Sequence, residues 1–215
     1  MLKVWYSEVS KNTIEQIKQN IDYNALSKRE HLKILDFGCG NGRYMRILQT
    51  LFPKADIFGA DIDKENIENL KGEFKNLFIL SPQKMGLDFE DNYFDLVFSS
   101  NVIEHIPHQQ YLEYIHKIHK ILKSNSKFVF GTPNYPYKRF YDMKKAFGAL
   151  FKLNFYKFRY YLFDDPTHIN PLNYKKLEDD FQIFSVLELK PTTIFLKKIF
   201  KDKKYSDKIN GIAIK

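Results

Sequence analysis

The chain has 215 residues, which suffices for one α/β domain with a full hydrophobic core and is short for two. Its single cysteine, Cys39, excludes an internal disulfide and fits a reducing cytoplasm. The sequence contains no apolar run of 18 residues, so no membrane span is predicted. The net charge of +8 is local: residues 138–159 hold seven Lys or Arg against one Asp, and residues 197–208 hold six Lys against two Asp. Such clustering favours an anionic partner, although a general preference for Lys in the composition would also produce it.

The first 131 residues alternate short apolar segments with helical ones. Residues 12–26 predict an amphipathic helix with Ile14, Ile17 and Ile21 on one side. Strands are predicted at 32–37, 55–60, 77–80, 94–99 and 127–131, with helices at 42–51, 64–74 and 111–123 between them. This alternation indicates a parallel sheet with right-handed crossovers.

The pattern changes after residue 131. Residues 135–165 are crowded with Tyr, Phe, Lys and Arg without a clean period, so we expect an inserted cap of one or two helices. A helix from Pro171 to Asp180, a basic amphipathic stretch at 193–204, and strands at 183–189 and 211–214 follow. We therefore expect one domain over residues 1–215, with an N-terminal helical lid at 1–30 and a substrate cap at 135–170.

The most informative segment is Ile-Leu-Asp-Phe-Gly-Cys-Gly-Asn-Gly at residues 34–42. A glycine-rich turn between a strand and a helix lets the backbone approach a nucleotide-like ligand closely. Gly38, Gly40 and Gly42 give G-x-G-x-G, whereas a dinucleotide fingerprint places its third glycine one residue later. Asp61 ends the second predicted strand, nineteen residues beyond Gly42, where its carboxylate can accept hydrogen bonds from ribose hydroxyls.

Further landmarks follow these two in order along the chain: 87–95, Asn-Val-Ile-Glu-His-Ile-Pro at 101–107, and Gly-Thr-Pro-Asn at 131–134. Together with residues 34–42 and 59–61, they resemble the class I S-adenosylmethionine (SAM)-dependent methyltransferases, in particular the small-molecule branch that includes the ubiquinone-biosynthesis type. The resemblance covers roughly residues 30 to 135. It implies a Rossmann-like domain with a mostly parallel seven-stranded sheet flanked by helices, and SAM as the cofactor, released as S-adenosylhomocysteine.

The resemblance also implies roles for individual cofactor-binding residues. Asp36 would orient the glycine loop and reach the methionine amino group, while Asp61 would hold the ribose hydroxyls and Ile62 would lie against the adenine. Main chain near Asn101 would face the methionyl end. Relatives often carry an acid that accepts the adenine amino protons, and here the aligned segment is Gln83, Lys84 and Met85. The Gln83 oxygen can accept the same hydrogen bond, and Met85 can pack on the ring.

Two histidines are candidate catalytic residues. Methyl transfer from a sulfonium depends mainly on alignment of the reacting atoms, but a hydroxyl acceptor also needs a base with a pKa near 7. His105 follows the fourth predicted strand, and His168 lies in an Asp-Pro-Thr-His segment similar to one that lines the acceptor pocket of several small-molecule and glycan methyltransferases. The alternatives are that His105 caps the strand end and that His168 orders a turn with Asp165.

Histidine pairs at short spacing raise the question of a metal. The pairs are His105 with His108 and His116 with His119. The second pair falls on the polar side of a helix, and no Cys or carboxylate completes a ligand set in either case. We therefore expect no metal.

The basic aromatic cap is the expected acceptor site. Tyr137, Arg139, Tyr141 and Arg159 can supply aromatic walls and bind phosphate, although packing alone would also explain them. The leading hypothesis is O-methylation of a small-molecule or glycan-linked hydroxyl, including a phosphorylated one. A nucleic-acid methyltransferase is disfavoured because no Asn-Pro-Pro-Tyr-like motif follows the fourth strand. A further alternative is a lipid or quinone-precursor methyltransferase that binds the inner membrane surface peripherally through the 193–204 stretch. We expect a cytoplasmic protein, either a monomer or a homodimer.

Overall fold

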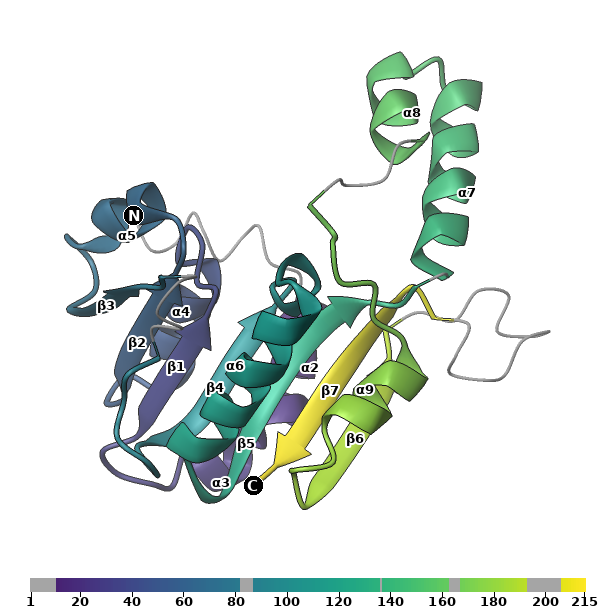
Figure 1. Cartoon of the computed structure of the whole chain (residues 1–215). Helices are drawn as coiled ribbons and strands as arrows, with labels where there is room; N and C mark the ends of the chain where they lie inside the picture. Colours follow the sequence, from purple (N-terminus) through teal and green to yellow (C-terminus); the bar gives the residue numbers. More distant parts are fainter. Residues whose placement is uncertain (1–10, 82–86, 136, 163–166, 193–205) are drawn as a thin grey trace.

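The computed structural model describes residues 11–81, 87–135, 137–162, 167–192 and 206–215 (Figure 1). Its strands form one seven-stranded sheet in the order β3-β2-β1-β4-β5-β7-β6. Strands β1 to β5 run parallel to one another, and β7 runs antiparallel to both β5 and β6. The predicted mostly parallel seven-stranded sheet is confirmed. The strands are β1 (Lys33–Phe37), β2 (Asp56–Asp61), β3 (Asn76–Ile79), β4 (Phe94–Ser100), β5 (Leu122–Pro133), β6 (Val186–Pro191) and β7 (Lys208–Ile214).

Helices cover both faces of this sheet and bury two separate hydrophobic clusters. The helices are α2 (Lys11–Ile21), α3 (Tyr23–Leu26), α4 (Arg43–Leu51), α5 (Lys64–Leu70), α6 (His108–Ile121), α7 (Tyr137–Phe151), α8 (Phe155–Leu162) and α9 (Tyr174–Asp180). Residues of α6 and α9 share one cluster, while residues of α2, α4 and α5 share the other. Along β1, Leu35 and Phe37 face the first cluster and Ile34 faces the second, as the two-residue period of a strand requires.

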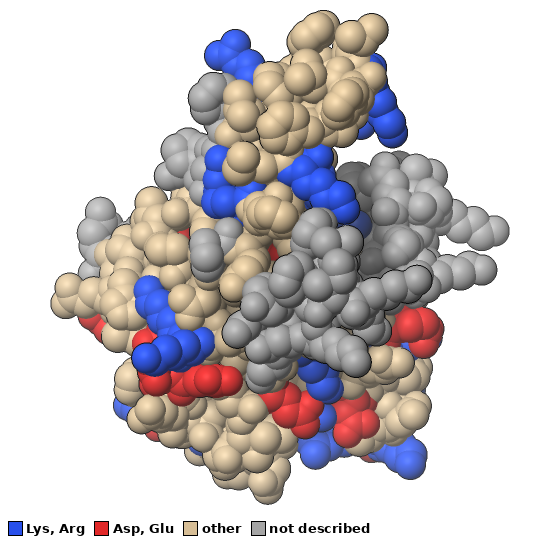
Figure 2. All heavy atoms as spheres, turned by 90° about the vertical axis from the view of Figure 1, so that its right-hand side faces the viewer, with Lys and Arg blue, Asp and Glu red and all other residues tan. Residues whose placement is uncertain are grey.

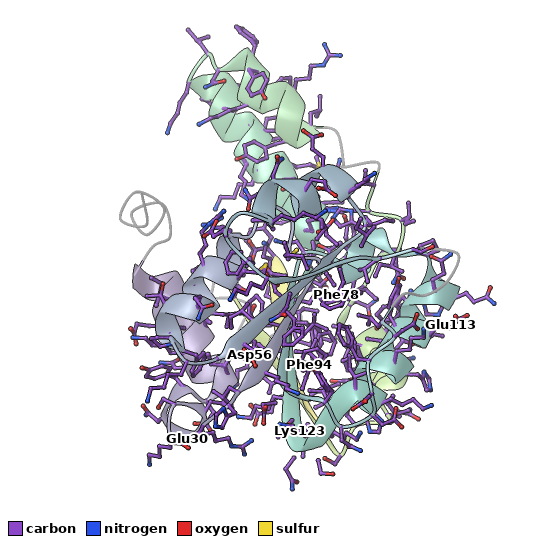
Figure 3. All side chains as sticks on the ribbon, turned by 90° about the vertical axis from the view of Figure 1, so that its left-hand side faces the viewer. Glu30, Asp56, Phe78, Phe94, Glu113 and Lys123 are labelled. Atoms are coloured by element: carbon purple, nitrogen blue, oxygen red, sulfur yellow. The ribbon has the colours of Figure 1, made fainter. Side chains whose placement is uncertain are left out.

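Aromatic rings fill the first cluster near β2 and β3. Phe78 and Phe94, labelled in Figure 3, both contact Phe58, with ring centroids 6.1 and 5.1 Å away respectively. Phe89 contacts the same rings edge-on, 4.8 Å from Phe78 and 4.9 Å from Phe94. This packing covers the middle of β2 and the start of β4 on the face of the first cluster.

Several element boundaries differ from the prediction because of single-residue geometry. The helix expected at 12–26 is interrupted at Asp22, whose φ of 59° is left-handed. The helix expected to begin at Pro171 begins at Tyr174 instead, since the Asn173 side chain caps it by accepting a hydrogen bond from the Lys176 amide at 3.0 Å. The fifth strand is longer than expected and starts directly after α6, at Leu122.

The N-terminal segment expected to be a lid is described only from Lys11. Ile14, Ile17 and Ile21 of α2 are buried in the second cluster, so this helix forms part of the layer that covers the sheet. Residues 1–10 lie outside the described part of the chain.

The segment expected to be a cap forms a helical hairpin. Helices α7 and α8 pack on each other and stand out from the end of the sheet where β5 finishes (Figure 1). Lys and Arg side chains lie near the tip and at the base of the hairpin, and residues without charge cover the surface between them (Figure 2). Among the described helices, none combines the length and the apolarity that crossing a bilayer requires.

Candidate functional site

A cavity of about 540 Å³ opens at the carboxyl ends of β1, β2 and β4. Ligands bind at this edge in open α/β sheets because the turns there bring backbone and side chains of several strands together. The described lining residues are Phe37, Gly38, Gly40, Asn41, Arg43, Tyr44, Asp61, Ile62, Leu80, Ser100, Asn101, Val102, His105, Ile106, Pro107, Gln110 and Tyr114.

The glycine turn forms one wall of the cavity. Gly38, Gly40 and Gly42 have φ values of 76°, 50° and 78°, all left-handed, and Gly42 is the N-cap of α4. The amide of Gly38 donates to the Ala60 carbonyl at 2.7 Å, which ties the turn to the end of β2. A Cβ atom on Gly38 would lie 2.2 Å from Cγ2 of Val102, so only glycine lets these two loops approach so closely.

Asp61 connects the glycine turn to the start of α5. Its Oδ2 accepts a hydrogen bond from the Gly40 amide at 2.7 Å, and its Oδ1 accepts one from the Asp63 amide at 2.8 Å. The carboxylate also lines the cavity, beside the 63% exposed Ile62. Both residues therefore line the cavity, and their contacts with ribose and adenine stay predictions.

Asp36 lies beneath the turn and does not belong to the described cavity lining. Its side chain is buried, and neither carboxylate oxygen has a hydrogen-bond partner among the described residues. Burial, followed by the nearby charge of Asp61, raises the pKa of Asp36 to about 8. The backbone amide of Met45 is close enough to offset part of this rise in pKa without making a hydrogen bond.

Cys39 is buried under the same turn. Burial, with the charges of Asp36 and Asp61, raises the pKa of its thiol far above the usual range. A thiol that stays protonated is a poor nucleophile, which supports a packing role for Cys39.

Asn101 lines the cavity at the end of β4, and Lys208, which is outside the described lining, bonds to its side chain. Asn101 has a φ of 56°, its amide donates to the Gly131 carbonyl at 2.8 Å, and its Oδ1 accepts from Lys208 Nζ at 3.0 Å. The sequence did not identify Lys208, because the antiparallel β7 brings it here from near the end of the chain. The predicted contacts of Gln83, Lys84 and Met85 lie outside the described residues.

Glu104, His105 and His168 form a cluster that meets the cavity at His105. His105 lines the cavity, and its ring centroid lies 4.7 Å from that of His168. One ligand atom from each of these three residues falls within 4.8 Å of the others. The 3₁₀ turn η1 (Ile103–His105) supplies two of them, and the loop before α9 supplies His168.

Hydrogen bonds fix both imidazole rings. Nδ1 of His105 lies 3.1 Å from the Thr167 carbonyl, and Nδ1 of His168 lies 2.5 Å from the hydroxyl of Tyr135. Glu104 is fully buried, and its Oε2 accepts from Thr132 Oγ1 at 3.2 Å. Burial raises the pKa of the Glu104 carboxyl, and hydrogen bonding and the charges of His105 and Lys208 oppose that rise. The sequence did not identify Glu104, Thr132 or Tyr135 as site residues.

The histidine pairs chosen by spacing do not form this cluster. His108 stacks on Tyr111 at the start of α6, with centroids 5.8 Å apart, and His116 bonds through Nδ1 to the Leu112 carbonyl of its own helix. The fold instead joins His105 to a histidine from a distant segment.

The residues predicted to hold the acceptor are in the hairpin and outside the described cavity lining. Tyr141 is buried, Tyr137 is partly buried and Arg159 is exposed. The guanidinium of Arg139 donates to the Leu162 carbonyl at 3.0 Å, which links α7 to the end of α8. The arrangement gives Arg139 and Tyr141 a structural position in the hairpin, and their contact with an acceptor stays a prediction.

Comparisons with known proteins identify a methyltransferase domain in this chain. A family model described as a methyltransferase domain matches residues 9–184. A 100-residue segment is 30% identical to a malonyl-[acyl-carrier protein] O-methyltransferase of Legionella pneumophila, covering 45% of this chain and 34% of that protein. The chain thus matches about a third of the length of that relative.

Solved structures share the fold at low sequence identity. A SAM-dependent methyltransferase from Archaeoglobus fulgidus aligns over 94% of both chains with a TM-score of 0.64 and 19% identity. The plantazolicin methyltransferase BpumL, in complex with S-adenosylhomocysteine (SAH), aligns over 100% of this chain and 93% of its own with a TM-score of 0.62 and 14% identity.

Proposed function

The chain belongs to the class I SAM-dependent methyltransferases, and we propose that it methylates a hydroxyl group of a small-molecule or glycan-linked acceptor. The observation that carries the proposal is the cluster of Glu104, His105 and His168 at one end of the cavity, where an acceptor proton can be removed. The O-methyltransferase name of the Legionella pneumophila relative supports the same acceptor atom. An acceptor bearing phosphate is consistent with the basic residues of α7 and α8.

The residues of the cavity fit SAM in three respects. Gly38 leaves the turn without a Cβ where one would fill the space next to Val102. Asp61 presents a carboxylate to the cavity for the ribose hydroxyls, and Asp36 is a buried carboxyl with no partner among the described residues. A cationic amino group beside the turn would stabilise the ionised form of Asp36, as expected for the methionine end of the cofactor.

The chemistry requires the chain to align two groups and to handle one proton. SAM supplies an electrophilic methyl group on a sulfonium. The glycine turn, Asp61 and Asn101 line the cavity and would hold that donor. His105 and His168 lie at the acceptor end, where their fixed rings limit how a hydroxyl can approach and can accept its proton.

The test is turnover of SAM with a panel of cell-extract metabolites and nucleotide sugars, read as products heavier by one methylene unit. We expect His168→Ala to abolish product formation while the affinity for SAH stays unchanged. His116→Ala, a matched histidine on the exposed side of α6, serves as the control and should retain activity. Full activity of His168→Ala would contradict the proposed role of the histidine cluster.

A membrane-surface acceptor is the second candidate. The turn between α7 and α8 exposes apolar side chains next to Lys152 and Lys157, a combination that binds anionic lipid surfaces. The exposed residues are Phe151 (88%), Leu153 (76%), Phe155 (64%) and Tyr156 (82%). The basic stretch at 193–204, which the sequence favoured for this role, lies outside the described residues.

Co-sedimentation with vesicles of phosphatidylglycerol tests this second candidate. Replacing Phe151 and Leu153 with Ser should reduce binding while leaving SAH affinity unchanged. Equal binding by the variant and the unaltered chain would remove the hairpin from consideration. Salt-sensitive retention of RNA, in place of vesicle binding, would instead favour the nucleic-acid alternative.

A further inference from the structure

We propose that Glu104, His105 and His168 bind one divalent metal ion at the acceptor end of the cavity. Two imidazoles and one carboxylate are a ligand set that binds divalent metals such as Zn²⁺, Mn²⁺ or Fe²⁺ and leaves coordination positions open. The structure brings one ligand atom of each residue within 4.8 Å of the others. The role of the ion in catalysis rests on the proposed hydroxyl methylation, whereas its binding does not.

The buried carboxylate of Glu104 is the group in this cluster that a bound cation would stabilise most. Its side chain is fully buried, and Oε1 has no hydrogen-bond partner among the described residues. A buried carboxylate oxygen without a partner costs free energy, and a metal ion would satisfy it. Thr132 holds the other oxygen, so the carboxylate has a fixed orientation.

The two histidines have the supporting contacts that metal ligands usually have. A ligating imidazole generally donates its second ring N–H to a carbonyl or another oxygen, which fixes the ring and its tautomer. Here Nδ1 of His105 lies 3.1 Å from the carbonyl and 2.9 Å from the hydroxyl of Thr167, and Nδ1 of His168 faces the Tyr135 hydroxyl. In the tautomer in which Nδ1 donates to these oxygens, Nε2 of each ring is the atom that would bind the ion.

The geometry requires the side chains to move closer together. Atoms bound to one ion at about 2.0–2.2 Å in a tetrahedral arrangement lie about 3.3–3.6 Å apart, so a separation of 4.8 Å closes by about 1.2–1.5 Å through side-chain rotation. Both histidines are partly exposed, which gives an ion access from the cavity side.

The open positions indicate what the ion would do. With an ion bound, His105 and His168 would be ligands in place of the bases of the metal-free site, and an acceptor hydroxyl at an open position would have a lowered pKa and lose its proton to solvent before its oxygen attacks the methyl carbon. The new C–O bond forms as the C–S bond breaks, and SAH leaves as a neutral thioether. Acceptors with a second adjacent oxygen, which can occupy another open position, are the favoured class.

Direct metal binding tests the proposal without any need for an acceptor. The full chain, first dialysed against a chelator, is titrated with Mn²⁺, followed by the electron paramagnetic resonance signal of the free ion, and with Zn²⁺ by calorimetry. We expect one ion per chain. Glu104→Gln and His168→Ala should each weaken binding by about tenfold or more, since even changes to supporting residues cost 10–100-fold.

His116→Ala is the matched control and should bind the ion like the unaltered chain. SAH affinity and the melting temperature establish that each variant is folded, and His168→Ala, in a partly exposed loop, covers the case in which Glu104→Gln does not fold. Absence of binding by the unaltered chain at millimolar metal, or equal binding by the variants, would overturn the site.

Activity measurements distinguish the catalytic role of the metal from the proposed methylation of a hydroxyl. Hydroxyl methylation that persists undiminished in excess chelator overturns the metal role and leaves the proposed function standing. Metal binding that depends on His168 together with methylation of nitrogen or carbon supports the site and overturns the hydroxyl acceptor.

Discussion

The close approach of Gly38 to Val102 predicts which glycine of the turn is least replaceable. Gly38 and Gly40 both have left-handed φ values, 76° and 50°, so Ala is strained at either position. A Cβ on Gly38 would also lie 2.2 Å from Cγ2 and 2.8 Å from Cγ1 of Val102, whereas nothing lies within 4 Å of one on Gly40. Gly40→Ala is therefore a matched control that isolates the steric clash.

The magnitudes follow from two contributions. A left-handed φ costs an alanine about 1–2 kcal/mol, and forcing an extra methyl into packed surroundings adds about 1–3 kcal/mol. We expect Gly40→Ala to lower the free energy of unfolding by only the first amount and Gly38→Ala by both. For a chain of this size, the difference corresponds to a melting temperature about 2–12 °C lower for Gly38→Ala.

Calorimetric melting of both variants measures this difference, and SAH affinity reports on the cavity. A double-mutant cycle with Val102→Ala identifies the cause, because that change removes both Cγ atoms and leaves Cβ of Val102 at 3.0 Å. Val102→Ala should cost less in the Gly38→Ala background than in the unaltered chain. Equal stability of the two glycine variants, or no coupling in the cycle, would refute the reasoning.

Three further predictions concern the buried and hydrogen-bonded groups of the site. The pKa of Asp36 is raised to about 8, so the folded chain holds a proton that the unfolded chain releases near 3.8. This group therefore makes the free energy of unfolding fall as pH rises between those values, by at most about 1.4 kcal/mol per pH unit. Asp36→Asn should flatten that fall in thermal melts from pH 5 to 8. Asp61→Ala should reduce SAH affinity about tenfold or more in calorimetry, against exposed Asp88→Ala as the control, and unchanged affinity would remove the ribose role. Tyr135→Phe should lower kcat about tenfold with little change in SAH affinity, because the hydroxyl that fixes His168 is lost; a change in SAH affinity alone would point to the donor end instead.

The cavity wall formed by the glycine turn and Asp61 could be predicted because its residues are local in sequence. A buried strand must end before the chain can turn, and left-handed glycines at 38, 40 and 42 mark that turn without any knowledge of the rest. Asp61 follows from the same logic one strand later. The element boundaries were less predictable, since they depend on single contacts such as the Asn173 side-chain cap that starts α9.

The acceptor end could not be predicted in the same way because distant segments build it. The contact between His105 and Thr167 spans 62 residues of sequence, and the bond between Tyr135 and His168 spans 33. Spacing rules compare neighbours three or four residues apart, so they selected His108 as the partner of His105. Only the sheet topology, which returns the chain past β5 and through the hairpin, brings His168 to the end of β4.

Asn170 explains how this distant loop is held in register with the turn after β4. Its side chain is buried, its amide donates to the Glu104 carbonyl at 3.0 Å, and its Nδ2 donates to the Ile103 carbonyl at 3.3 Å. Its Oδ1 accepts from Lys176 Nζ at 2.7 Å, which connects the same residue to α9. Since buried polar groups are costly when unpaired, these three bonds favour one placement of the loop. The position of His168 beside Glu104 and His105 therefore depends on an asparagine that does not belong to the cluster, and on the end of α9 that anchors it.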